Sequence, residues 1–114
     1  MIIKTGEKIH VIIRREFPQD IRRHFIGEVT DATESVVRAE GYPYLYDTNT
    51  NLFVRKHYSQ IRIFSLVDGV NIISVPPRTA NLKKMVYRFT DKNRMILTDG
   101  DSLSMDVNEF GANR

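Results

Sequence analysis

The feature that most constrains the fold is a period of two in the apolar residues. Along this 114-residue chain, apolar side chains recur mostly at every second position, and turn-forming residues interrupt them regularly. Residues 9–13 and 24–29 alternate in this way, and Val36-Val37 opens a third run. Because successive side chains of a β-strand point to opposite faces, the pattern predicts strands. Many short strands without a long helix predict an all-β barrel or sandwich.

An Asp-Gly pair marks the clearest turn. Asp68-Gly69 separates two strong apolar runs, residues 61–67 and 70–75. Both central residues of a type I′ turn need positive φ, and Asp-Gly suits them. We therefore expect a hairpin here.

The C-terminal third continues the same pattern. Residues 85–90 and 94–98 are further strand candidates, and residues 91–93 form the turn between them. A second Asp-Gly pair, Asp99-Gly100, predicts another turn.

Two segments are short helix candidates. Residues 16–24 contain Pro18 and lack a wide apolar stripe, so they allow at most one or two turns. Residues 79–84 allow a short helical turn with Thr79 as a weak cap. We expect strands to dominate and no helix to exceed about twelve residues.

Composition excludes several classes of protein. The chain has no cysteine, which rules out disulfides, thiolate metal sites and a cysteine nucleophile. It has neither the apolar region of a signal peptide nor a run long enough to span a membrane. The length suits a single domain over residues 1–114. We expect a cytoplasmic protein that does not contact a membrane.

Charge is distributed unevenly, although the net charge is only +3. Residues 78–94 are basic, whereas residues 95–113 carry four acids and no Lys or Arg. This segregation fits a polyanion-binding face, or two solvated faces that partly pair with each other. The candidate binding residues of the basic stretch are Arg78, Lys83, Lys84 and Arg88.

No motif indicates catalysis. The three histidines lack metal-site spacing, and we expect His10 and His24 to lie on strand surfaces. Asp99, Asp101 and Asp106 do not match a calcium loop, and no nucleotide-binding or nucleophile motif is present. The sequence therefore predicts a protein that is not an enzyme and needs no cofactor or metal.

Three tyrosines at alternate positions predict one further hairpin. Tyr42, Tyr44 and Tyr46 share one face of an extended strand, and Asn49-Thr50 is a suitable turn centre. A two- or four-residue loop there gives one register, with the cross-strand pairs Tyr46–Phe53, Tyr44–Arg55 and Tyr42–His57. These residues either stabilise a hairpin lying on the barrel or form a recognition surface, because Tyr and Arg are enriched at binding hot spots.

Two segments resemble the Sm-like (LSm) family of small five-stranded barrels. Residues 25–29, Phe-Ile-Gly-Glu-Val, followed by residues 36–39, Val-Val-Arg-Ala, resemble its first motif, in which Gly27 would let a bent second strand curl over the core. Residues 66–75, Leu-Val-Asp-Gly-Val-Asn-Ile-Ile-Ser-Val, resemble its second motif. Residues 8–75 would then form the barrel core, with an extended hairpin, and residues 76–114 a C-terminal β extension. Strand–Gly–strand patterns also occur in SH3-like barrels.

The chain departs from the Sm-like pattern where that family contacts RNA. Ser35 stands where the first motif usually has a base-binding Asn, and Asp68 stands where the second motif has an Arg before its Gly. The resemblance therefore implies the barrel more than it implies RNA binding.

The function expected from the sequence is that of a non-catalytic binding module. Single-stranded RNA is the first ligand class, because a basic stretch can follow phosphates and aromatic rings can stack on bases. The alternative is a structural or protein-interaction protein that works by self-assembly. We expect a homo-oligomer, because residues 70–75 are apolar on both faces and an open barrel leaves a strand edge to be paired. In the Sm-like family the corresponding strand pairs with a neighbouring subunit.

Overall fold

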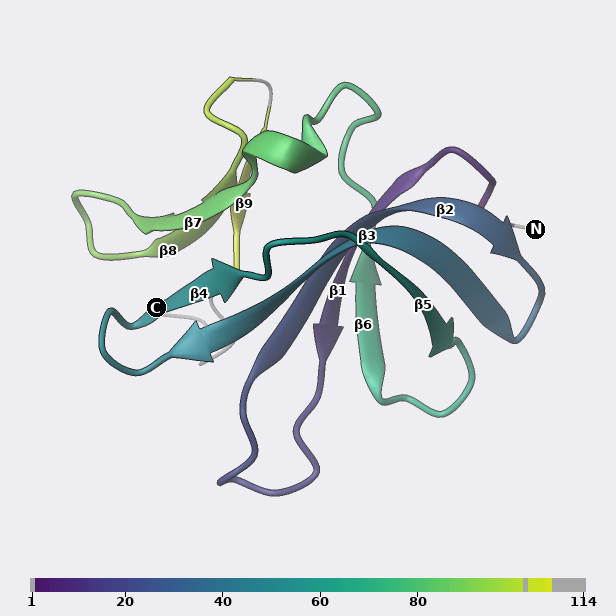
Figure 1. The fold of residues 1–114 in the computed structure, drawn as a ribbon, viewed down its shortest axis with the longest axis horizontal. Coiled ribbons are helices and arrows are strands. Elements are labelled where there is room, and N and C mark those ends of the chain that lie inside the picture. The colour runs from purple at the N-terminus through teal and green to yellow at the C-terminus, as the bar shows by residue number, and fades with distance from the viewer. Residues whose placement is uncertain (1, 102, 108–114) are drawn as a thin grey trace.

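The computed structural model describes residues 2–101 and 103–107, and over these residues it contains two antiparallel sheets (Figure 1). The larger sheet contains β1 (Lys8–Ile13), β2 (Arg23–Ala32), β3 (Val36–Asp47), β4 (Leu52–Arg55), β5 (Gln60–Ser65) and β6 (Asn71–Ser74). The smaller sheet contains β7 (Val86–Phe89), β8 (Met95–Thr98) and β9 (Ser104–Asp106). The prediction of an all-β chain with C-terminal strands is confirmed.

The larger sheet is strongly curved and open. Its strands follow the order β4-β3-β2-β1-β6. The long strand β3 pairs with β5 through its first half and with β4 through its second half. Within the described residues no ladder joins β5 to β6, so the sheet does not close into a barrel.

The expectation of a hairpin across Asp68-Gly69 is therefore wrong, although the chain does turn at these residues. Gly69 has φ +73°, and the Asp68 carboxylate accepts a hydrogen bond from the Val70 amide at 3.0 Å. The two flanking strands do not pair with each other. Strand β5 pairs with β3, and β6 pairs with β1. Phe64 of β5 and Ile73 of β6 reach the same buried cluster from opposite ends of the curved sheet.

Two glycines occupy the centre of the curve, where β2 and β3 pair directly. Gly27 lies opposite Gly41. A β-carbon on Gly41 would clash with the carbonyl oxygen of Ile26, and one on Gly27 would meet the Phe25 ring. Side chains are excluded here by close packing, which lets the two strands bend over the core.

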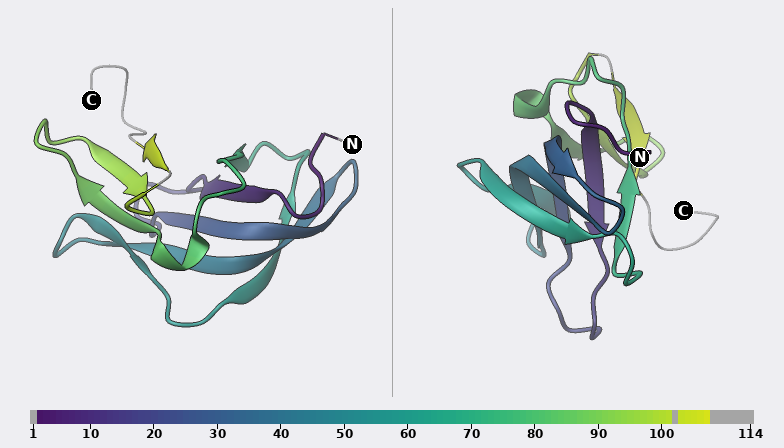
Figure 2. Two further views of the ribbon diagram at one scale, coloured as in Figure 1. Left: turned by 90° about the horizontal axis from the view of Figure 1, so that it is seen from above. Right: turned by 90° about the vertical axis from the view of Figure 1, so that its right-hand side faces the viewer.

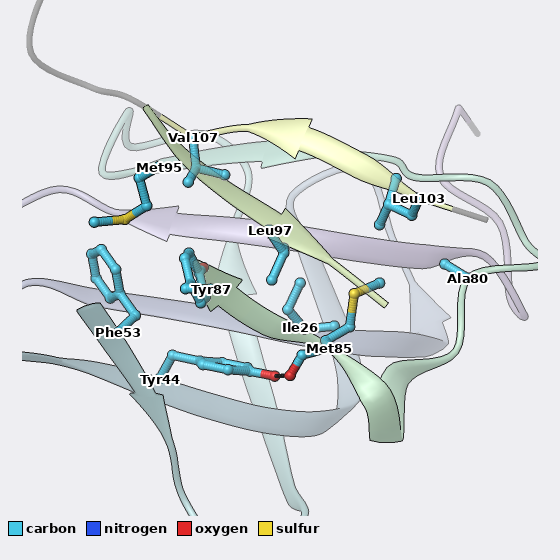
Figure 3. Close-up of a cluster of buried hydrophobic side chains, with 10 residues drawn as sticks. All are labelled: Ile26, Tyr44, Phe53, Ala80, Met85, Tyr87, Met95, Leu97, Leu103 and Val107. Atoms are coloured by element: carbon cyan, nitrogen blue, oxygen red, sulfur yellow. Dashed lines mark hydrogen bonds between the residues drawn. The ribbon is translucent and has the colours of Figure 1, made fainter. Parts of the chain in front are cut away.

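Two hydrophobic cores lie on opposite faces of the larger sheet. The inner core fills the concave side and consists of Ile9, Val11, Phe25, Val29, Val37, Ala39 and Phe64. The intersheet core lies beneath the smaller sheet and consists of Ile26, Tyr44, Phe53, Ala80, Met85, Tyr87, Met95, Leu97, Leu103 and Val107 (Figure 3). Figure 2 shows the smaller sheet covering one end of the larger one.

The helix candidates have different outcomes. Residues 16–24 contain a turn, because Pro18 follows Phe17 and the Asp20 amide donates to the Phe17 carbonyl at 3.0 Å. A short 3₁₀ helix, η1 (Leu82–Lys84), forms in the other segment, but its cap is Asn81 rather than Thr79. No helix in the described part of the chain has the length and hydropathy needed to cross a membrane.

Candidate functional site

The tyrosine hairpin has the register that the sequence predicts. Tyr46 lies opposite Phe53 and Tyr44 opposite Arg55. The ladder ends at Arg55, so the expected third pair, Tyr42 with His57, lies outside it, and His57 is exposed.

This hairpin does not present one exposed face, because the smaller sheet covers its centre. The exposed fraction is 1% for Tyr44 and 6% for Phe53. Tyr44 donates a hydrogen bond from its hydroxyl to the Met85 carbonyl at 2.8 Å (Figure 3), and its ring lies edge-on to Tyr87. Burial raises the pKa of Tyr44 to about 12. Of the two alternatives for this hairpin, the stabilising one applies to Tyr44 and Phe53, which are buried and hold the two sheets together.

Arg55 secures the rim of the same contact. Its guanidinium lies 4.6 Å from the centre of the Tyr42 ring, a cation–π geometry. It also donates to the Lys83 carbonyl at 2.8 Å, which ties β4 to η1. The expected Arg–Tyr contact exists, but with Tyr42 rather than with its ladder partner Tyr44.

Two histidines lie buried between the sheets. His10 of β1 and His24 of β2 are each 1% exposed, and both contact the Tyr87 hydroxyl, at 3.0 Å from His10 Nε2 and 2.5 Å from His24 Nδ1. His24 also stacks on Phe53 at 3.9 Å. Burial, together with His24, lowers the pKa of His10 to about 3. The expectation of surface histidines is wrong, because the smaller sheet covers the face of the larger sheet that carries them.

The histidine cluster has the chemistry of a structural polar network. Within the described residues, no group of three or more His, Cys, Asp or Glu side chains is placed to hold a metal ion. Tyr87 bridges the two imidazoles, so this network joins the sheets by hydrogen bonds as well as by apolar contact.

The four residues of the basic stretch are exposed and come from a loop, η1 and β7. Lys83 and Lys84 belong to η1, Arg88 to β7, and Arg78 to the preceding loop. Their main chain makes contacts with the rest of the molecule, since the Arg78 carbonyl accepts a hydrogen bond from the Lys8 ammonium group at 2.5 Å.

A second group of cations surrounds a small cavity at the end of the larger sheet. We call this the cationic mouth and define it by Arg23, Lys56 and Arg62. The cavity measures about 220 Å³, and its apolar lining includes Phe25 and Phe64. The sequence does not predict this cavity, because its three cations come from separate segments. The one available signal was Arg62, which shares a strand face with the inward-pointing Phe64.

The outer edges of the curved sheet carry apolar side chains. On β5, Ile61 and Ile63 are 63% and 66% exposed. Near β6, Val70 is 42% exposed and Ile72 is 52% exposed. Natural proteins usually cover or charge such edges.

Comparisons with protein-family models, with curated proteins and with solved structures found no match. The evidence for each candidate site is therefore its own geometry.

Proposed function

We propose that this protein is a non-catalytic binding module that self-assembles through the two open edges of its larger sheet. Single-stranded RNA is the ligand class that we propose for the assembled module.

The two strand edges carry the self-assembly proposal. Among the described residues, β5 pairs only with β3, and β6 pairs only with β1. One chain thus offers two different edges, and pairing β5 of one copy with β6 of the next would satisfy both. Such contact would also bury Ile63 and Ile72. Burial stabilises the assembly by roughly 25 cal/mol per Å² of apolar surface removed from water. Head-to-tail contacts of this kind form closed rings when the rotation between copies allows.

An Sm-like arrangement of the core is the finer fold that we propose. Five strands, β1, β2, β3, β5 and β6, contribute side chains to one inner core. The bend at Gly27 matches what the resemblance implies for the second strand. Pairing between subunits would supply the closure that the single chain lacks.

Exposed cations support RNA as the ligand. The cationic mouth and the basic stretch both present Lys and Arg to solvent, and phosphate contacts provide much of the affinity for nucleic acid. The buried tyrosines Tyr44 and Tyr87 take no part in this proposal, so base stacking is assigned to other surfaces.

Edge pairing is tested with two matched substitutions. Ile72→Lys places a charge on the β6 edge, whereas Val86→Lys changes a residue of similar exposure, 53%, on the smaller sheet. We expect multi-angle light scattering to show an oligomer for the parent protein and for Val86→Lys, and a single chain for Ile72→Lys. A parent protein that remains monomeric at high concentration would overturn the assembly proposal.

A further inference from the structure

The cationic mouth is assembled by the ends of several strands. Arg23 begins β2 and lies in register with Ile13 of β1 and Leu45 of β3, so its backbone is fixed by ladders on both sides. Lys56 directly follows β4, and its amide donates to the Pro43 carbonyl at 2.9 Å. The backbone at both positions is therefore fixed by the sheet before any ligand arrives.

Arg62 is oriented by a neighbour on its own strand. Its Nε and Nη2 atoms donate to the Gln60 side-chain oxygen at 3.1 and 2.6 Å. These two bonds use only part of the five N–H donors of a guanidinium. The planar group is thereby positioned, and donors remain to bind an oxyanion by two parallel hydrogen bonds.

The charge around this cavity is of one sign. Its described lining includes Arg23, Lys56 and Arg62 and contains no Asp or Glu. Three positive groups around one small cavity repel one another, so an anion bound among them relieves an unfavourable interaction as well as forming new ones. Arginine and lysine together match the oxygens of a phosphate group.

The floor of the cavity is apolar. Phe25 and Phe64 lie beneath it as part of the inner core, with ring centres 5.1 Å apart, and the half-buried Ile13 and Leu45 supply its accessible apolar surface. With a volume of about 220 Å³, the cavity is smaller than the pockets of about 300–1,000 Å³ that hold drug-sized ligands. Its size suits one phosphate with one flat ring rather than a larger molecule.

A longer groove continues from the same rim. This neighbouring cavity measures about 950 Å³ and shares Ile13 and Arg23 with the mouth. Arg14 and Arg15 line it, together with Glu16, Gln19 and Asp20. A polymer of nucleotides that leaves the mouth therefore has a partly cationic path along the surface.

We propose that the cationic mouth binds one nucleotide of a single-stranded nucleic acid. Arg62, Lys56 and Arg23 hold its phosphate, and its base lies against the half-buried apolar side chains of Ile13 and Leu45. This inference rests on the binding function proposed above and assigns it a place other than the basic stretch.

The test compares two pairs of exposed cations. Fluorescence anisotropy with a labelled single-stranded oligouridine measures the affinity of the parent protein, of Lys56→Gln/Arg62→Gln, and of the control Lys4→Gln/Arg38→Gln, whose two exposed cations lie outside both the mouth and the basic stretch. We expect the mouth variant to bind at least about tenfold more weakly, as expected for the loss of charge-assisted hydrogen bonds. Its salt dependence should fall by about 0.7 in slope, since the mouth holds one phosphate and each single-strand phosphate contact contributes about 0.7. The control should change by less than about threefold, and circular dichroism checks that both variants fold.

Competition distinguishes the source of the nucleotide. Displacement of oligouridine by uridine monophosphate, but not by the same concentration of inorganic phosphate, would support a site for both ring and phosphate. A protein that binds the monophosphate but does not bind the oligonucleotide would have a ligand site at this cavity for a free nucleotide and not for a nucleic acid.

Failure of this inference is distinguishable from failure of the proposed function. Equal weakening by both variant pairs, or unchanged binding by the mouth variant, would overturn the assigned site while the RNA-binding function stands. A parent protein that binds neither the oligouridine nor the monophosphate would overturn both. Self-assembly is measured separately by light scattering.

Discussion

The two cores of this protein are built from different chemistry. The inner core contains only aliphatic side chains and the Phe25–Phe64 pair, and it lies within one continuous curved sheet. The intersheet core adds two tyrosines, and the buried His10 and His24 border it through Tyr87. It joins parts of the chain that no ladder of the described residues connects.

This difference assigns the two cores different roles. An apolar core has no titrating group, so its contribution to stability is insensitive to pH. A core bordered by the neutral, buried His10 is most stable while that histidine remains neutral, because a buried charge without a partner is unfavourable. We therefore expect the packing of the smaller sheet on the larger sheet to depend on pH.

Acid provides the largest expected contrast between the cores. The pKa of His10 is lowered from 6.5 to about 3 in the folded protein, so the stability that its neutral form contributes is present above pH 6.5. That contribution is lost as the pH falls toward 3 and amounts to roughly 5 kcal/mol at most. Urea unfolding between pH 7.5 and 4, followed by tyrosine fluorescence and near-ultraviolet circular dichroism, measures it.

Two substitutions isolate the histidine in that experiment. His10→Gln should flatten the dependence of the unfolding free energy on pH, whereas His57→Gln, at an exposed position, should leave it unchanged. Parallel curves for His10→Gln and the parent would show that the buried imidazole does not cause the acid sensitivity.

Removing one phenylalanine from each core gives the next largest effect. Phe25→Ala should lower the unfolding free energy by about 3–5 kcal/mol, because it leaves a cavity beneath the bend at Gly27. Phe53→Ala should cost less, since a groove of about 330 Å³ beside it already admits solvent. Thermal and urea denaturation measure both losses, and a larger loss for Phe53→Ala than for Phe25→Ala would contradict this expected order.

Loss of the bridging hydroxyl should have a moderate effect. Tyr87→Phe keeps the ring but removes the oxygen shared by His10 and His24, and we expect a loss of about 1–3 kcal/mol. Tyr58→Phe is the matched control, because Tyr58 is 72% exposed. Equal stabilities for these two variants would mean that the bridge contributes nothing.

The Arg55–Tyr42 contact should have the smallest effect. A double-mutant cycle of Arg55→Ala and Tyr42→Ala should give a coupling of about 0.5–1 kcal/mol at this rim. Pairing Arg55→Ala with Tyr46→Ala serves as the control and should give a smaller coupling. A coupling below the error of the measurement would mean that Arg55 contributes to stability only through its hydrogen bond to the Lys83 carbonyl.

The sequence by itself determined the strands, most of the turns and the register of the tyrosine hairpin. Alternation and turn-forming residues act between neighbours in the chain, so the pairing of Tyr44 with Arg55 follows from local geometry. The same rules failed at Asp68-Gly69, where β5 and β6 have better partners elsewhere in the sheet.

Only the tertiary structure decided which side chains are buried and which cations meet. Alternation assigns His10 and Tyr44 to a strand face but does not show that a second sheet covers that face. Likewise Arg23 meets Lys56 and Arg62 because the start of β2, the residue after β4 and the first half of β5 lie at one rim. Packing between sheets depends on contacts far apart in the sequence, and no periodicity in a single strand records them.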